Sequence, residues 1–311
     1  MICLHNMRGC SMEKQLNYLE EYCNGAGTRS INERLLALYK QWYNAWYEGK
    51  EKLYTDLFLN CPFLLTCTDA YIQNRIMFFG QEAHDKCSYL HDFKKELDEY
   101  FVSESYHYEK LIRYDEHGIN QNFLKSRKVC AGLDPDTRFK DGEADYRRFT
   151  SVLVNNLNKI SYGGKSTPVD ERLRDIYSPI EFEGHKGNIF YHEMRILKPE
   201  KIIFATGSYT NHLERDFGKD VADQLRSSWK TLYLGKKGDH KVISEVSEFE
   251  YAGIKMKYIY GYHPSAHLNT EDRRNYFGAI KTFVTSPCAT DKTIRATPHN
   301  MPAVSSGKFV P

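Results

Sequence analysis

The chain lacks several features that would assign it to a class at once. None of its apolar runs approaches the ~20 residues of a membrane-spanning helix, so we expect no span. Its first residues show no basic segment followed by an apolar core, and we expect no secretory signal. The eight cysteines form no paired Cys-x-x-Cys set. Reduced thiols in a cytoplasmic protein are therefore expected.

The chain also has little net charge and no internal repeat. A formal charge of +2 does not by itself indicate a nucleic-acid partner. Residues 1–150 carry 20 Lys and Arg against 23 Asp and Glu, whereas residues 151–311 carry 23 against 18. The second half is thus the more basic, as a local nucleic-acid footprint requires, although such an excess is also ordinary. With 311 residues, 41% of them hydrophobic, the chain is long enough for one large domain with additions.

The stretch Arg75–His84 organises the rest of the prediction. A short apolar run ends at Gly80, and three polar side chains follow it, Gln81, Glu82 and His84. An apolar run stopped by glycine is typical of a buried strand in a parallel sheet. The residues after such a strand lie at its carboxyl end, where open α/β sheets bind their ligands. We therefore expect these side chains to line a cleft.

Three further apolar runs end in polar groups in the same way, at 151–156, 201–209 and 258–265. Helical patterns lie before, between and after the four runs, at residues 12–23, 30–46, 89–101, 143–149, 188–197, 211–230 and 270–284. Strands that alternate with helices predict an α/β fold, a parallel sheet with helices on both faces. Residues 241–250 and 254–260 flank Ala252-Gly253 and predict a hairpin whose second arm is the last strand.

Three regions surround or interrupt this pattern. We predict an N-terminal helical extension over 1–70, in which Ser30 caps a helix and Trp42 and Trp46 pack on the core. The α/β domain covers 71–285, and 286–311 is expected to be a disordered tail. Residues 105–142 and 161–187 show no clear elements, and the basic run Lys125-Ser-Arg-Lys128 is interpreted as solvated surface, with phosphate contact as the alternative.

The strand ends resemble the motifs of the uracil-DNA glycosylase superfamily. Uracil-excising members read Gly-Gln-Asp-Pro-Tyr-His in the first loop, where this chain has Gly80-Gln-Glu-Ala-His84. Val152-Leu-Val-Asn155 resembles their base-reading segment, and Ala205-Thr-Gly-Ser208 resembles a strand end that reads Trp-Gly-Ser. His263-Pro-Ser265 matches the start of their His-Pro-Ser-Pro-Leu loop, and Tyr276-Phe-Gly278 stands in place of an aromatic–glycine turn. The five motifs follow the family's order.

The resemblance implies a central four-stranded parallel sheet with the active site at its carboxyl ends. It implies a monofunctional DNA glycosylase that hydrolyses the N-glycosidic bond of a flipped-out pyrimidine and leaves an abasic site. Neither metal nor cofactor is expected. Some members carry a four-cysteine iron–sulfur cluster, for which Cys61, Cys67, Cys87 and Cys130 are the only conceivable set here, and we do not expect one. DNA is the expected partner, and we expect a monomer.

The resemblance also assigns roles to individual residues. Glu82 replaces the aspartate that activates water, although it can instead cap a helix, and His263 is placed to stabilise the leaving base. The predicted substrate-binding residues are Gln81, His84, Asn155 and Tyr89, with Asn156 and Phe93 as alternatives to the last two. The predicted DNA-binding residues are Ser208, Pro264, Ser265, His267 and Leu268, of which Leu268 or His267 fills the space of the flipped base.

The identity of the base stays open in the sequence. Ala83 and His84 stand where uracil-excising members have proline and a tyrosine that packs against C5 of uracil. A smaller polar wall admits a C5 substituent, so the alternatives are uracil or a hypermodified cytosine of phage DNA, whose excision would serve antiviral defence. A catalytically silent DNA-binding relative is a further alternative, against which the presence of both Glu82 and His263 argues.

Overall fold

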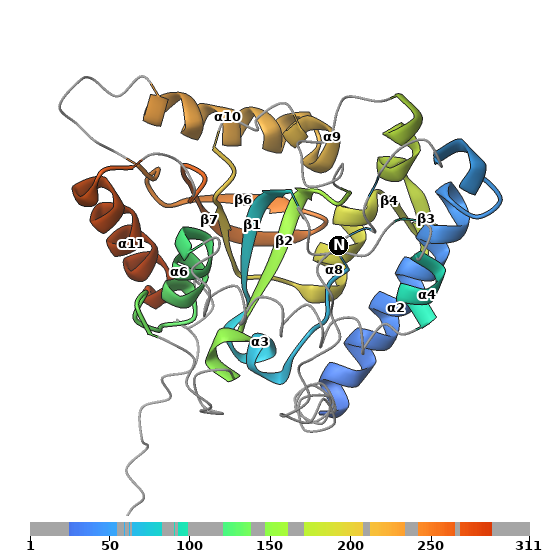
Figure 1. The fold of residues 1–311 in the computed structure, drawn as a ribbon, viewed down its shortest axis with the longest axis horizontal. Helices are drawn as coiled ribbons and strands as arrows, with labels where there is room; N and C mark the ends of the chain where they lie inside the picture. The colour runs from blue at the N-terminus through green and yellow to red at the C-terminus, as the bar shows by residue number, and fades with distance from the viewer. Residues whose placement is uncertain are drawn as a thin grey trace, which may run out of the picture.

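The computed structural model describes residues 25–54, 59, 62, 64–82, 90, 93–98, 121–137, 147–160, 171–207, 212–233, 242–264 and 268–287. Its centre is a five-stranded sheet with the order β2-β1-β5-β7-β6 (Figure 1). The strands are β1 (Ile76–Glu82), β2 (Val152–Asn158), β5 (Lys201–Phe204), β6 (Ser247–Tyr251) and β7 (Ile254–Tyr260). The first three and β7 run parallel, and β6 is antiparallel to β7. The α/β class is as predicted.

The sheet has five strands rather than the predicted four because both arms of the hairpin join it. Ala252 and Gly253 form the turn, with φ angles of 56° and 74°. Two successive residues with positive φ form the two-residue hairpin turn whose twist matches that of the paired strands. Tyr251 therefore pairs with Ile254, and β6 covers the outer edge of β7. The predicted hairpin is confirmed.

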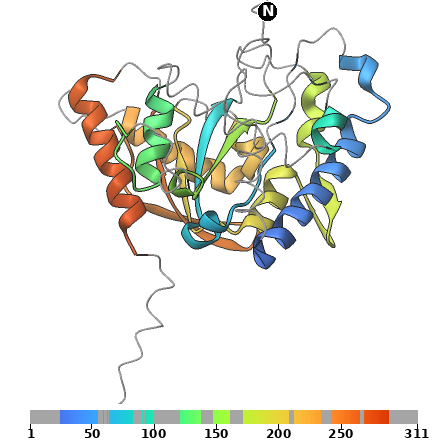
Figure 2. The same ribbon diagram turned by 60° about the horizontal axis from the view of Figure 1, so that its bottom comes forward.

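Helices cover both faces of the sheet. One face packs against α2 (Ala26–Trp46), α8 (Ile189–Leu197), α9 (Leu213–Phe217) and α10 (Lys219–Tyr233), and the other against α6 (Gln121–Cys130) and α11 (Thr270–Thr285). Figures 1 and 2 show α6 and α11 on the opposite side of the sheet from α2 and α8. Alternate residues of β1 join the two hydrophobic clusters, Met77 and Phe79 the first and Ile76 and Phe78 the second.

The N-terminal helix α2 is part of the first cluster. Trp42 and Trp46 are buried and lie against Phe93 of α4 (Phe93–Asp98), so the prediction that they pack in the core is confirmed. The predicted start at Ser30 is wrong, since α2 begins at Ala26. The Thr28 side chain bonds Asp69 of α3 (Asp69–Asn74), which anchors the first turn ahead of Ser30.

Two segments without clear sequence signals contain regular structure. One holds α6, and the other holds the 3-10 helix η4 (Glu171–Tyr177) and the small hairpin of β3 (Ile180–Phe182) and β4 (His185–Gly187). A second 3-10 helix is η1 (Glu51–Tyr54). In α6 polar residues occupy buried positions, which hides the apolar period.

The basic run of α6 shows how this happens. Arg127 is buried, its guanidinium lies 4.0 Å from the ring centroid of Phe149, and its Nη2 donates to the Val152 carbonyl at 3.0 Å. Lys128 is also buried, and Lys125 pairs with Asp136. The interpretation of this run as solvated surface is therefore wrong.

Other predictions have mixed outcomes. The proposed aromatic–glycine turn at 276–278 is wrong, since these residues lie inside α11, where Tyr276 is buried. The predicted helix at 12–23 and the tail from residue 288 lie outside the described residues. Within the described ranges, no helix is long and apolar enough to cross a membrane.

Candidate functional site at the carboxyl ends of the strands

Strand β1 continues two residues beyond the glycine that was expected to end it. Gly80 pairs with Asn156 and Glu82 with Asn158 of β2. A Cβ atom on Gly80 would lie 2.6 Å from Asn156 Oδ1 and 3.1 Å from the Phe123 ring. Glycine is therefore needed here for close approach of neighbouring side chains, and it does not end the strand. Glu82 stands on strand backbone at the sheet edge; its side chain lies outside the description.

Three predicted segments meet at this edge. The Gln81 side chain donates from Nε2 to the carbonyl of Thr206, which follows β5, at 2.8 Å. Gly207 is left-handed, with φ 56°, and a Cβ there would lie 3.4 Å from Gln81 Nε2 and 3.3 Å from the backbone nitrogen of His263. The ends of β1, β5 and β7 therefore meet around Gly207, and both Gln81 and half-buried His263 lie close to it.

The turn at Gly207 is held by the last residue of β7. Tyr260 donates its hydroxyl proton to the Gly207 carbonyl at 3.0 Å and accepts a hydrogen bond from Thr206 Oγ1 at 3.0 Å. Burial raises the pKa of Tyr260 to about 12, so the hydroxyl stays protonated at neutral pH. The Gly207 N–H also donates to the Gly261 carbonyl at 3.1 Å. The turn is thus fixed before any ligand binds.

The segment after β7 leads from the site into α11. Pro264 is buried, and half-buried Leu268 packs in part against the second hydrophobic cluster. Arg273 Nη2 donates to the Leu268 carbonyl at 3.2 Å, and Asn269 caps the helix. The remaining predicted site residues lie outside the described part of the chain: His84, Tyr89, Ser208, Ser265 and His267.

Asn155 occupies a different environment from the one expected of a base-reading residue. Its side chain is fully buried, and Nδ2 donates to Glu193 Oε2 of α8 at 3.0 Å. Its Oδ1 accepts from Lys159 Nζ at 2.7 Å and from the Asn156 N–H at 2.8 Å. A carbonyl oxygen has two lone pairs, and both are used. A base would have to replace one of these partners, and the predicted role of Asn155 stays a prediction.

The partners of Asn155 form a buried ion pair. Lys159 Nζ lies 2.6 Å from Glu193 Oε1, and both side chains are 0% exposed. Tyr39 of α2 donates to the same carboxylate oxygen at 2.9 Å. The sequence offered one signal that was missed, a single acidic residue among the inward-facing apolar residues of α8. Buried charges require such partners.

A second polar cluster lies at the end of β2. Arg215 of α9 donates from Nη2 to the Leu157 carbonyl at 3.0 Å and to Asn158 Oδ1 at 3.3 Å. Its guanidinium stacks 3.5 Å from the Tyr177 ring centroid. Its Nε and Nη2 bind both oxygens of Asp216 at 2.5 and 3.0 Å. Asn158, which this guanidinium contacts, is paired with Glu82 on the neighbouring strand β1.

Burial shifts the titration of two groups in this cluster. It raises the pKa of Asp216, which is 0% exposed, to about 6, although the adjacent Arg215 opposes the shift. It lowers the pKa of His212 to about 4, and the positive charge of Arg215 acts in the same direction. At neutral pH the cluster therefore holds an ionised Arg–Asp pair beside a neutral imidazole.

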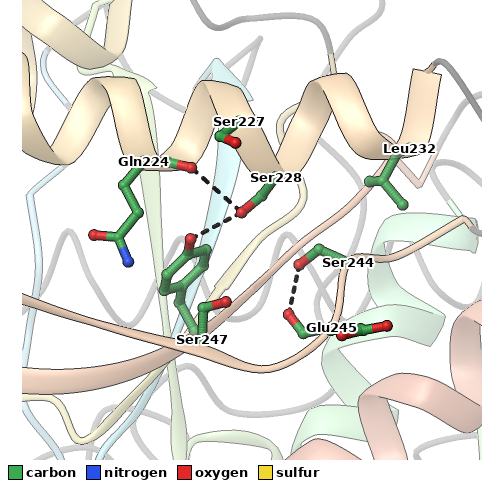
Figure 3. Close-up of a pocket in the computed structure, with 8 residues that line it drawn as sticks. Gln224, Ser227, Ser228, Leu232, Ser244, Glu245 and Ser247 are labelled. Carbon is green, nitrogen blue, oxygen red and sulfur yellow. Dashed lines mark hydrogen bonds between the residues drawn. The ribbon is translucent and has the colours of Figure 1, made fainter.

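A cavity of about 310 Å³ lies between α10 and the β6–β7 hairpin. Figure 3 shows Gln224, Ser227 and Ser228 of α10 across from Ser244. Ser228 shares a hydrogen bond of 2.8 Å with the Tyr258 hydroxyl, and Ser244 donates to the Glu245 carbonyl at 2.9 Å. These hydroxyls are bonded to the cavity's own walls, so the cavity offers less free chemistry than the strand edge.

Two of the four cysteines considered for a cluster, Cys67 and Cys130, are buried free thiols, and Cys61 and Cys87 lie outside the description. Among the residues that the structure covers, no group of three or more His, Cys, Asp or Glu side chains is placed to hold a metal ion. No protein-family model matches the chain, and no curated protein matches its sequence.

Proposed function

We propose that the chain is a DNA glycosylase that hydrolyses the N-glycosidic bond of a flipped-out uracil or modified pyrimidine. One observation carries the proposal. Gln81, Gly207 and His263 belong to three glycosylase-like segments far apart in the sequence, and they meet at the carboxyl edge of the sheet. Ligands of open α/β sheets bind at this edge. Glu82 ends β1 at the same edge.

The reaction breaks the bond between the sugar C1′ and the base N1, and the electron pair leaves with the base. The sugar becomes an oxocarbenium-like cation that water attacks. In the proposal Glu82 orients this water, accepts its proton and offsets the positive charge of the sugar. His263 donates an N–H to O2 of the departing pyrimidine, whose negative charge develops in the transition state.

The test is base release from synthetic DNA. The chain is incubated with single-stranded and duplex oligonucleotides that carry uracil or a C5-modified cytosine, and with modified phage DNA, and alkali-labile abasic sites are measured. Glu82→Gln and His263→Ala should each slow single-turnover release by about 100-fold or more while DNA binding is kept. Absence of release from every substrate would refute the proposal, and wild-type rates in both variants would refute the assigned roles.

Excision of a C5-modified cytosine is the second candidate, favoured by Ala83 and His84 in place of proline and tyrosine. If the natural base carries a C5 group, His84→Tyr should block it by steric overlap and leave uracil release intact. An extra methylene or two in a packed site costs roughly 1–3 kcal/mol, and a larger group costs more. Release of both bases is compared in His84→Tyr and His84→Gly, and equal effects on both bases would contradict this candidate.

A further inference from the structure

Arg215 presents an unused donor group at the strand edge. Three sides of its guanidinium are occupied: the Tyr177 ring covers one face, Asp216 binds the Nε edge, and Nη2 reaches the end of β2. Within the described ranges no hydrogen bond or ion pair involves Nη1, which carries two N–H groups. The side chain as a whole is 30% exposed, so part of it is open to solvent.

The surroundings hold this guanidinium rigidly. Asp216 is fully buried, and Asn188 donates from Nδ2 to its backbone carbonyl at 2.9 Å. The Tyr177 ring that stacks on Arg215 stacks in turn on Phe190, with an angle of 5° between the ring planes. An arginine that is oriented before binding loses less side-chain entropy when it binds an oxyanion. The oriented guanidinium of Arg215 is therefore suited to bind an oxyanion.

We propose that Arg215 Nη1 binds a phosphodiester oxygen of DNA next to the extruded nucleotide. The proposal rests on the proposed glycosylase function. Asn158, which Arg215 contacts, pairs with Glu82 on the neighbouring strand, and neighbouring strands lie about 4.8 Å apart. A phosphate bound at Nη1 therefore lies near the end of β1, whose last residue is Glu82. A guanidinium N–H bond to phosphate is charge-assisted, which suits a backbone contact that is independent of base sequence.

The test combines protein variants with neutral phosphates. Binding is measured by fluorescence anisotropy on a single-stranded oligonucleotide with one 2′-fluoro-2′-deoxyuridine, which resists hydrolysis, and on versions with a single methylphosphonate near that base. The variant is Arg215→Gln/Asp216→Asn, which leaves no unpaired buried carboxylate, and thermal unfolding checks that it folds. Arg226→Gln is the control, since Arg226 pairs with Glu214 and Asp223 on the same face.

The double variant should weaken binding of the all-phosphate strand by roughly 10-fold or more, as expected for a charge-assisted hydrogen bond. At one position near the uracil analogue, a methylphosphonate should weaken binding of the wild-type protein by the same factor as the double variant does. The same methylphosphonate should cause no further loss of affinity in the double variant. The slope of log K against log salt should fall by about 0.7 for one lost phosphate contact to single-stranded DNA. Arg226→Gln should change none of these quantities.

If the loss of affinity caused by the double variant and the loss caused by a methylphosphonate combine multiplicatively at every position tested, the two changes are independent. That result would overturn the proposal and leave Arg215 with a structural role. Wild-type protein that binds none of the oligonucleotides, or a loss of the same size in Arg226→Gln, would overturn it too. The proposed function fails by a different result, the absence of base release by the wild-type chain. If the variant and one methylphosphonate weaken binding without adding to each other, but the wild-type chain releases no base, the phosphate contact stands and the proposed glycosylase function is refuted.

Discussion

At the scale of single residues, Gly207 is the position where three strand ends touch. Its φ is positive, and in that conformation the Cβ of any other residue clashes with the backbone. Its Cβ position is also crowded by Gln81 and His263, two of the residues proposed for the site. Gly132 has a similar φ of 73° but nothing within 4 Å of its Cβ position, and it therefore serves as a matched control.

Gly207→Ala should lower the free energy of unfolding more than Gly132→Ala does. Both substitutions carry the left-handed backbone cost of about 1–2 kcal/mol. Only Gly207→Ala adds contact with neighbouring atoms, and it should also slow base release, because the Cβ lies 3.3 Å from the backbone nitrogen of His263, which must shift. Urea unfolding and single-turnover release measure the two effects. Equal destabilisation by the two substitutions would mean that the crowding at Gly207 has no energetic consequence.

The buried pair of Lys159 and Glu193 leads to a second prediction at this scale. Lys159→Met should lower the free energy of unfolding by about 3–5 kcal/mol, because it leaves a buried carboxylate without its counter-charge. Lys159→Met/Glu193→Gln removes both charges and should recover much of the loss in urea unfolding. Lys50→Met breaks the exposed pair with Asp175 and should cost less than about 1 kcal/mol. No recovery in the double variant would show that lost packing, rather than charge, causes the effect.

At the scale of elements, the start of α11 fixes the segment that follows the site. The Asn269 side chain accepts a hydrogen bond from the Asp272 N–H at 2.8 Å, and Arg273 holds the Leu268 carbonyl. Both contacts satisfy backbone groups that a helix terminus and its preceding residue leave open. The positions of Leu268 and Asn269 at the start of α11 thus depend on these two contacts.

Asn269→Ala should lower the free energy of unfolding by about 0.5–2 kcal/mol, because the first turn of α11 loses its side-chain acceptor. Asn269→Asp keeps an acceptor and adds a charge that favours the helix N-terminus, so it should remain near the wild-type value. Chemical unfolding of the three proteins measures the difference. If aspartate is as destabilising as alanine, the cap is not the cause.

At the scale of the whole molecule, two opposed titrations act over the same pH range. The pKa of Asp216 is raised from 3.8 to about 6, so its contribution to stability is complete below pH 3.8 and is lost as the pH rises to about 6. The pKa of His212 is lowered from 6.5 to about 4, so its contribution is complete above pH 6.5 and is lost as the pH falls to about 4. The two contributions oppose each other between these limits.

Removing either titrating group should therefore change the slope of the free energy of unfolding against pH. Relative to wild type, His212→Asn should lose stability as the pH rises from 4 to 6, with a slope of at most about 1.4 kcal/mol per pH unit. Asp216→Asn should show the reverse, with a larger slope because Asp216 is fully buried whereas His212 is only half-buried. Urea unfolding at several pH values gives the differences in slope. Parallel curves for all three proteins would contradict both assigned shifts.

The sequence by itself determined the α/β class, the edge at which the strands end, and most helices around the sheet. These features follow from local patterns, since a strand buried on both faces must be apolar throughout and an amphipathic helix repeats every 3.6 residues. The predicted helix at 188–197 matches α8 within one residue, and the one at 270–284 matches α11 to the same extent. Candidate residues at strand ends were found in the same way.

Only the tertiary structure decided which polar groups meet. Asn155 is tied to Glu193 on another element, Arg215 reaches Asn158 from α9, and Arg127 is buried in a run that looked solvated. A hydrogen bond or ion pair needs two atoms within about 3 Å of each other. When the two residues are far apart in the sequence, no local repeat of residue types reveals that they meet. Burial of a charged side chain is therefore visible only when its partner is in place, because the partner is what makes that burial possible.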